Sequence, residues 1–243
     1  MRSARTLIMT MAAALLMAPY ATGADYKTIH GRTGLPKVME GKQKVWMDRG
    51  IVHLDVSGND LVVSQEFRLH YPGPPLEKDA QQIKVAVRED YYRSKGDTGM
   101  EVMPEDAKGF KAFAVYVDGK RTETVAEPWD VNKNHNTATR WRTWFMDFHP
   151  DQFHALKIVS RAPLGEQYDR KIVQFVSKDV GHWRGKPEYL EIRFSAPGKT
   201  EARLAGLEPK ANDINQRAVR WVYRKASPNR DVYIQLPPGY GRK

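Results

Sequence analysis

Apolar and polar residues alternate along most of this chain, starting at Val45. Residues 61–71 are the clearest case, and the apolar residues on one face of this segment are Leu61, Val63, Phe67, Leu69 and Tyr71. A period of two predicts a half-buried strand. The run Pro72-Gly73-Pro74-Pro75 predicts its end. The preceding apolar run at 51–56, joined through residues 57–60, predicts its hairpin partner.

The same alternation continues to the end of the chain. It predicts strands at 83–87, 113–117, 120–125, 141–148, 156–161, 172–177, 190–195, 219–223 and 232–236. Segments that contain Gly and Pro separate them, and helical periodicity is scarce. Short strands with turn residues between them predict an all-β protein, specifically an antiparallel β-sandwich of the immunoglobulin-like kind.

The spacing of the strands also suggests how the chain is divided. We expect residues 45–163 to form one β-sandwich lobe and residues 164–243 a second β-rich lobe, because a polar stretch follows a complete set of strands at Pro163. One large sandwich is the alternative. Residues 25–44 are polar and show no period, which predicts a flexible N-terminal arm.

Residues 1–24 have the three parts of a secretory signal peptide. Arg2 and Arg5 supply the positive start, residues 7–19 are mostly apolar, and small residues follow at 21–24. An uncleaved membrane anchor is the alternative, but a spanning helix needs about 20 apolar residues and this run is shorter. We therefore expect an exported protein, periplasmic or extracellular, with no transmembrane segment in the mature chain.

The composition narrows the classes of partner. The formal charge is +10, and no cysteine is present, so the fold cannot depend on disulfides. A positive charge favours association with anionic polymers, such as an envelope polysaccharide. The basic residues are scattered, and an exported protein rarely meets nucleic acid, so we do not expect nucleic acid as a partner.

The second half of the chain resembles a loosely defined group of uncharacterised exported bacterial β-sandwich domains. The resemblance lies in the placement of strands, turns and tryptophans in four segments: residues 113–120 (FAVYVDGK), 141–159, 181–194 and 219–236. It supports the expected fold. It implies no activity, since these domains have none to carry over.

No motif for catalysis is present. The chain has no Cys and no Gly-x-Ser-x-Gly elbow. Residues 196–200 (APGKT) end like a phosphate-binding loop, but that loop needs glycine at position 193, which is Arg. Glu89 and Asp90 form an acidic cluster, yet adjacent strand residues point to opposite faces and cannot cooperate as a hydrolytic pair. We expect no catalytic residues and no cofactor.

One segment has the residue types of a metal site. Asp147, His149, Asp151 and His154 crowd the sequence MDFHPDQFH, and imidazole with carboxylate can hold a divalent ion. Pro150 follows His149, so the strand is expected to end there and the four groups to diverge. We interpret the segment as a polar turn and predict no metal.

Two clusters combine aromatic and cationic side chains, which suits a sugar ring or a peptide. The first comprises Arg88, Tyr91, Tyr92 and Arg93, and the second Trp183 and Arg184. These six residues are the candidate ligand-binding residues. For Trp183, the alternative is that its indole closes the end of the core.

Together these features favour an exported, non-catalytic interaction module that binds an envelope glycan, an anionic polymer or another protein. The alternative is a hydrolase of envelope polymers whose site is assembled from dispersed residues. A pocket with converging carboxylates or histidines would favour the enzyme, and an aromatic patch would favour the binding module.

Overall fold

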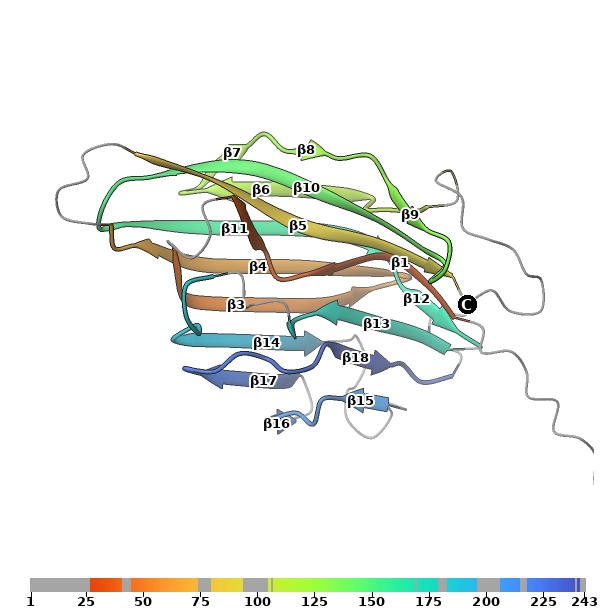
Figure 1. Cartoon of the computed structure of the whole chain (residues 1–243). Helices are drawn as coiled ribbons and strands as arrows, with labels where there is room; N and C mark the ends of the chain where they lie inside the picture. The colour runs from red at the N-terminus through yellow and green to blue at the C-terminus, as the bar shows by residue number, and fades with distance from the viewer. Residues whose placement is uncertain are drawn as a thin grey trace, which may run out of the picture.

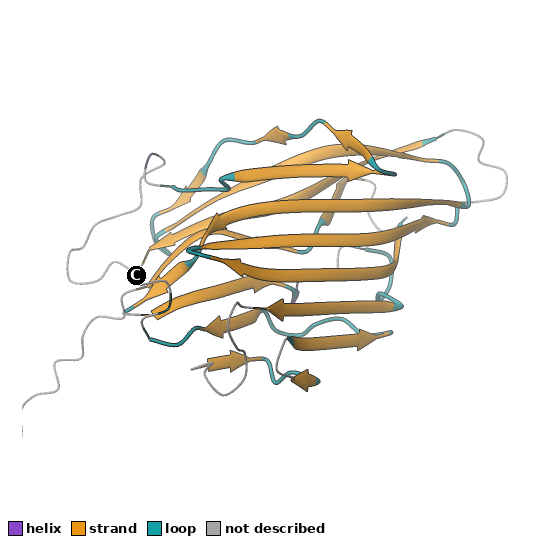
Figure 2. Cartoon of the chain, turned by 180° about the vertical axis from the view of Figure 1, so that it is seen from behind, coloured by secondary structure: helices purple, strands orange, loops and turns teal. Residues whose placement is uncertain are grey.

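A computed structural model describes residues 27–40, 45–73, 80–93, 105, 107–168, 170–178, 183–195, 206–214, 218–238 and 240. The expected signal peptide and the loop-like residues 196–200 lie outside this part of the chain. Strands dominate the described residues, and no helix occurs among them (Figure 2). The prediction of an all-β protein is confirmed.

The described strands form two open sheets packed against each other (Figure 1). The larger sheet has the order β15 (Gly206–Glu208), β18 (Val232–Gln235), β13 (Arg170–Val176), β12 (Gly165–Gln167), β1 (Lys27–Gly34), β5 (Gln81–Arg93), β10 (Thr137–Phe148) and β8 (Val125–Ala126), while β2 (Lys37–Glu40) pairs with β5 and β9 (Asp130–Asn132) with β10. The smaller sheet has the order β16 (Asp213–Ile214), β17 (Val219–Arg224), β14 (Tyr189–Ser195), β3 (Trp46–Ser57), β4 (Asp60–Tyr71), β11 (Gln152–Pro163), β6 (Ala112–Val117) and β7 (Lys120–Thr122).

The predicted hairpin at residues 51–71 exists as β3 and β4. The strands pair from Ser57↔Asp60 outward, and Gly58 takes a positive φ of 61° in the connection, a conformation that glycine adopts without steric cost. Leu61, Val63, Phe67, Leu69 and Tyr71 face the other sheet together with the buried Gln65, and the alternate residues face outward. Here the period of two predicted both the strand and its buried face.

One hydrophobic cluster fills the space between the sheets. Its largest fully buried side chains include Trp144, Phe148, Phe175, Phe194 and Trp221. These residues come from β10 and β13 of the larger sheet and from β14 and β17 of the smaller one. The two sheets therefore share a single core.

The structure differs from the expected division of the chain. Each sheet takes strands from both sides of the boundary at residue 164, so that boundary does not separate the sheets. Residues 27–34 and 37–40, placed in the expected arm, form β1 and β2 instead. Both corrections have one cause, which is that periodicity along a chain does not show which distant strands pair. Here β14 pairs in parallel with β3, and β1 pairs in parallel with β13. The strand order does not establish an immunoglobulin-like topology.

Candidate functional site

The long strand β5 carries two adjacent buried carboxylates. Glu89 and Asp90 are both 0 % exposed. Val85 and Val87 face the core, so Glu89 lies on the inner face of the larger sheet and Asp90 on its outer face. The two acids therefore belong to separate networks, as the alternation predicted.

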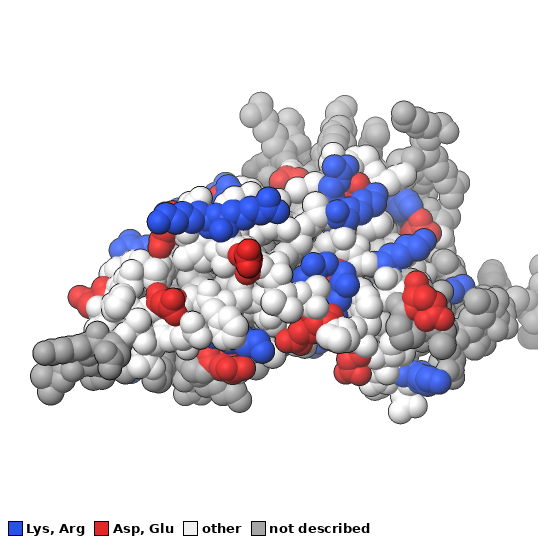
Figure 3. Space-filling model, turned by 90° about the horizontal axis from the view of Figure 1, so that it is seen from above, with Lys and Arg blue, Asp and Glu red and all other residues white. Residues whose placement is uncertain are grey.

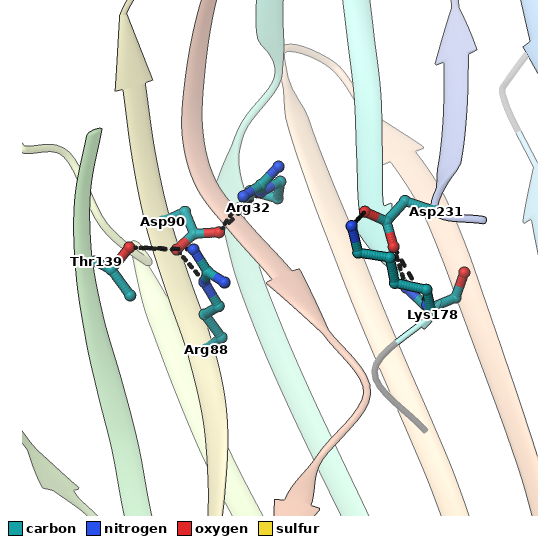
Figure 4. A network of polar contacts seen from close by, with 7 residues as sticks. Arg32, Arg88, Asp90, Thr139, Lys178 and Asp231 are labelled. Atoms are coloured by element: carbon teal, nitrogen blue, oxygen red, sulfur yellow. Dashed lines mark hydrogen bonds and ion pairs between the residues drawn. The ribbon is translucent and has the colours of Figure 1, made fainter. Parts of the chain in front are cut away.

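Asp90 is held by three side chains on the outer face (Figure 4). Arg32 donates to Oδ2 from Nε at 2.8 Å and from Nη2 at 2.5 Å. Arg88 donates from Nε to Oδ1 at 2.5 Å, and the Thr139 hydroxyl donates to the same oxygen at 2.8 Å. A buried carboxylate is tolerated only when it is paired and hydrogen-bonded, and these donors satisfy both oxygens.

The Glu89 carboxylate, on the inner face, is likewise fully hydrogen-bonded. Arg140 donates to it from Nε at 2.6 Å and Nη2 at 3.1 Å, and Arg142 from Nε at 3.0 Å. The backbone N–H of Phe110 donates as well. Gly109 allows this approach, because a Cβ there would overlap Glu89 Oε1. Neither carboxylate has the free lone pairs that a hydrolytic acid or nucleophile needs.

The Asp90 network is one end of a row of polar side chains across the outer face of the larger sheet, which we call the polar row. Strand pairing places its members next to each other in the order Thr139, Asp90, Arg32, Gln174, Tyr233 and Glu208. Arg32 of β1 lies beside Gln174 of β13 because the two strands are parallel and the residues that follow them, Thr33 and Phe175, are partners.

The far end of the polar row opens into a pocket of about 570 Å³, which we call the β13–β18 pocket. Its cationic side chains are Lys27, Lys178 and Arg230, and its acids are Glu208 and Asp231. Amides and a phenol complete the lining: Gln167, Gln174, Asn229 and Tyr233. Every lining residue thus carries a polar group, and the charges leave one positive charge in excess.

Asp231 shapes the cationic side of the β13–β18 pocket (Figure 4). Its Oδ1 accepts from the backbone N–H groups of Ser177 at 3.1 Å and Lys178 at 3.2 Å. The Lys178 ammonium lies 4.0 Å from Oδ2. The carboxylate is therefore used to fix the segment that follows β13, and it leaves Lys178 59 % exposed.

Tyr233 contacts two other residues of this pocket. Its hydroxyl donates to Gln167 Oε1, and the Lys27 ammonium lies 5.0 Å from the ring centroid. Gln174, next to it in the polar row, has a buried Oε1 with no hydrogen-bond partner in the described part of the chain. A buried acceptor without a partner is costly, so a ligand that donates a hydrogen bond there would stabilise the site.

Of the six residues predicted to bind ligand, Arg88 contacts Asp90 on this face, and strand alternation places Tyr92 on the same face. Tyr91 is 5 % exposed and packs on the inner side with Ala138 and His30. Tyr92 and Arg93 are half-buried at the end of β5. The two predicted clusters lie at opposite ends of the sandwich, because Tyr91 is near the end of β5 while the segment before β14 lies near the start of β3.

Trp183 and Arg184 divide between core and surface. Trp183 is 2 % exposed, and its Nε1 donates to Pro36 O at 2.8 Å, so its indole closes the end of the core. Arg184 is exposed and lies 5.5 Å from the ring centroid of Trp46. These contacts match the interpretation of Trp183 as a residue that closes the end of the core.

The histidine-rich turn also contains no converging ligands. Both nitrogens of His154 face acceptors, Asp118 Oδ2 at 2.5 Å and Asp147 O at 3.0 Å. Burial opposes ionisation of Asp118, but hydrogen bonds from the Ala155 N–H and His154 outweigh it and lower the pKa of this carboxyl. Among the residues described, no group of three or more His, Cys, Asp or Glu is arranged to hold a metal.

The residues that line the β13–β18 pocket could not be found from sequence. They come from strands β1, β12, β13, β15 and β18, from the segment after β13 and from the segment before β18. Those that lie in strands are ordinary polar alternates there. Only the pairing of β13 with both β1 and β18 brings them together.

Basic residues do not gather in one patch on the side of the molecule seen from above. Figure 3 shows Lys and Arg there in separate groups, with Asp and Glu between them. This agrees with the scattered charge along the sequence.

In the described part of the chain, no helix has the length and hydropathy of a membrane span.

Comparison with solved structures identifies the fold. A candidate nutrient binding protein from Legionella pneumophila superposes with a TM-score of 0.60 at 12 % identity, over 88 % of this chain and 74 % of that one. This likeness shows a shared fold. No protein-family model and no curated protein sequence matches the chain.

Two peptidase-like structures are more distant. Yeast LTA4 hydrolase has a TM-score of 0.40 at 9 % identity, and 80 % of this chain covers 29 % of it. An M1 zinc metallopeptidase from Deinococcus radiodurans has a TM-score of 0.38 at 10 % identity, over 80 % of this chain and 42 % of that one. This chain spans less than half of either protein, and the likeness is too low to carry an argument.

Proposed function

We propose that this protein is an exported, non-catalytic binding module whose β13–β18 pocket takes a small polar ligand with an anionic group, of the class of sugar acids. One observation carries the proposal. Three cationic side chains, Lys27, Lys178 and Arg230, line one pocket together with Tyr233 and Gln174, whose Oε1 has no partner in the described part of the chain. A carboxylate would pair with the cations, and a ligand hydroxyl would donate to the glutamine.

Other features of the pocket support a sugar-like ligand. Amides, a phenol and two carboxylates offer both donors and acceptors, as a ligand with several hydroxyl groups requires. A pocket of about 570 Å³ falls within the range of about 300–1,000 Å³ usual for small-ligand sites. The Legionella pneumophila protein of the same fold, a candidate nutrient binding protein, makes a binding role the more natural one.

Binding is favoured over hydrolysis by the hydrogen bonding of three acids, of which Glu89 and Asp90 are buried and Asp231 is partly buried. Glu89, Asp90 and Asp231 each accept several hydrogen bonds from the protein itself. Export to the periplasm or the outside of the cell is supported by the composition of residues 1–24. Envelope glycans, which contain sugar acids, would then be within reach.

A thermal-shift titration of the full chain tests the proposal. Galacturonate at 100 times its dissociation constant should stabilise the fold by about 2.7 kcal/mol, a rise in Tm of about 5–10 °C for a chain of this size. Glucose, which lacks the carboxylate, should give a much smaller shift.

Two variants sharpen the test. Arg230→Gln should weaken galacturonate binding about tenfold or more. Arg121→Gln removes the same charge from exposed β7 on the other sheet and should have no effect. Equal shifts with galacturonate and glucose, or equal losses in the two variants, would contradict the assignment of an anionic ligand to this pocket.

A further inference from the structure

The outer face of the smaller sheet carries a second row of charged residues. Strand pairing aligns Arg224, Tyr189, Arg49 and Arg68 side by side on the adjacent strands β17, β14, β3 and β4. We propose that this arginine row binds a linear acidic polysaccharide laid across the strands. The site is independent of the β13–β18 pocket, which lies on the outer face of the larger sheet.

Tyr189 holds two of the three guanidinium groups. The Arg224 guanidinium lies 5.0 Å from the ring centroid and that of Arg49 lies 5.7 Å from it. A guanidinium attracted to an aromatic face loses less freedom when it binds an anion. The ring itself is fixed, because the Tyr189 hydroxyl donates to the buried Glu191.

The arginine row is not neutralised by the protein. Within the described residues, neither Arg49 nor Arg224 forms an ion pair, and both are exposed. In the described part of the chain Arg68 forms one ion pair, with Asp48 at 3.5 Å, and both of these side chains are exposed, at 58 % and 39 %. Its guanidinium also lies 4.3 Å from the ring centroid of Phe153. Exposed pairs of this kind are weak, so all three guanidinium groups can turn to an anionic ligand.

The acid nearest to Tyr189 does not compete for these arginines. Glu191 is 1 % exposed and accepts hydrogen bonds from Arg193 and Arg220 as well as from Tyr189. Arg193 and Arg220 therefore neutralise Glu191, which leaves the charge of Arg49 and Arg224 uncompensated. Glu188 pairs with Lys225 at 3.7 Å and likewise has its own cation.

The row continues at one end of the sheet. Trp46 lies on the same face, three residues before Arg49, and is 37 % exposed. Arg184 stacks on its ring at 5.5 Å and, in the described part of the chain, has no ion pair. A fourth guanidinium on an aromatic ring thus extends the cationic surface beyond the row.

The spacing of the strands points to the class of ligand. Neighbouring strands lie about 4.8 Å apart, which is close to the length of one sugar ring. Arg49 and Arg68 therefore stand about one sugar ring apart. Arg224 stands about two rings from Arg49, because Tyr189 occupies the strand between them. Arginine binds a carboxylate through two parallel N–H donors, so three of four consecutive rings can meet an arginine, and the remaining ring lies over Tyr189.

Fluorescence anisotropy with labelled oligogalacturonate and the full-length chain tests the proposal. The double variant Arg49→Gln with Arg224→Gln should lower the affinity at least tenfold. The matched control, Lys120→Gln with Arg121→Gln, removes the same charge from the exposed strand β7 of the same sheet and should change it less than twofold. Arg49→Lys keeps the positive charge but loses the two parallel N–H donors of arginine. Its affinity for oligogalacturonate should fall between that of the wild type and that of the double variant.

Three results would overturn the inference. The wild-type protein could fail to bind oligogalacturonate, both double variants could lose affinity equally, or single-stranded DNA of equal charge could bind more tightly than the glycan. A pocket variant, Arg230→Gln, separates the two proposals. If it alone abolishes oligogalacturonate binding, the pocket is the site and the arginine row is not.

Discussion

Replacement of the buried Glu191 by glutamine should remove a large part of the acid sensitivity of this fold. Burial raises the pKa of Glu191, but hydrogen bonds from Arg193, Arg220 and Tyr189 outweigh it and hold the pKa at about 2, against an ordinary value of 4.5. A pKa that is lower in the folded state stabilises the fold above pH 4.5. This contribution is lost as the pH falls from about 5 towards 2.

The size of the effect follows from the shift. One pKa unit corresponds to about 1.4 kcal/mol, so the ionised Glu191 contributes about 3 kcal/mol at pH 7. About 2 kcal/mol of this should be lost by pH 3, where the unfolded chain is protonated and the folded one is still ionised. Glu191 is 1 % exposed, but the side chains of Arg193 and Arg220 are 38 % and 35 % exposed, so solvent screening makes these figures upper values.

Urea unfolding of the wild type and of Glu191→Gln at pH 7 and pH 3 measures this difference. The wild type should lose about 2 kcal/mol more stability between the two pH values than the variant does. Other carboxyls with lowered pKa values, such as Asp60 and Glu66, titrate equally in both proteins and cancel. The same loss in both proteins would show that Glu191 is not ionised against its arginines in the fold.

Three further changes have expected outcomes. Gly109→Ala should destabilise the fold by about 1–3 kcal/mol, because the added Cβ overlaps Glu89 Oε1; an unchanged urea midpoint would contradict this. Trp183→Ala should lower the free energy of unfolding by about 3–5 kcal/mol in the same urea assay, and Trp183→Phe should lower it clearly less. Tyr233→Phe removes the hydroxyl that donates to Gln167 and should weaken galacturonate binding without changing oligogalacturonate binding to the arginine row, as calorimetry can show.

The two proposed binding surfaces share one design. In each, a ring (Tyr233 or Tyr189) is fixed by its own hydroxyl and stands beside cations. Beside the arginine row, Arg193 and Arg220 neutralise the buried Glu191. In the pocket, Asp231 lies 4.0 Å from the Lys178 ammonium, and one positive charge remains in excess.

The sequence by itself determined the all-β class and the buried face of individual strands, because a strand alternates its side chains whatever it pairs with. That alternation also placed Glu89 and Asp90 on opposite faces, and it located the β3–β4 hairpin, whose partners are neighbours in the chain. The aromatic and cationic clusters were a weaker guide. Arg88 belongs to a structural ion pair, and Trp183 belongs to the core.

Only the tertiary structure decided which distant strands became neighbours. The polar row depends on β13 lying between β1 and β18, and the arginine row on β14 lying between β17 and β3. Residues such as Gln174 or Arg224 are ordinary polar alternates in their own strands. Lateral pairing over more than a hundred residues depends on how the whole core packs, and no local pattern records it.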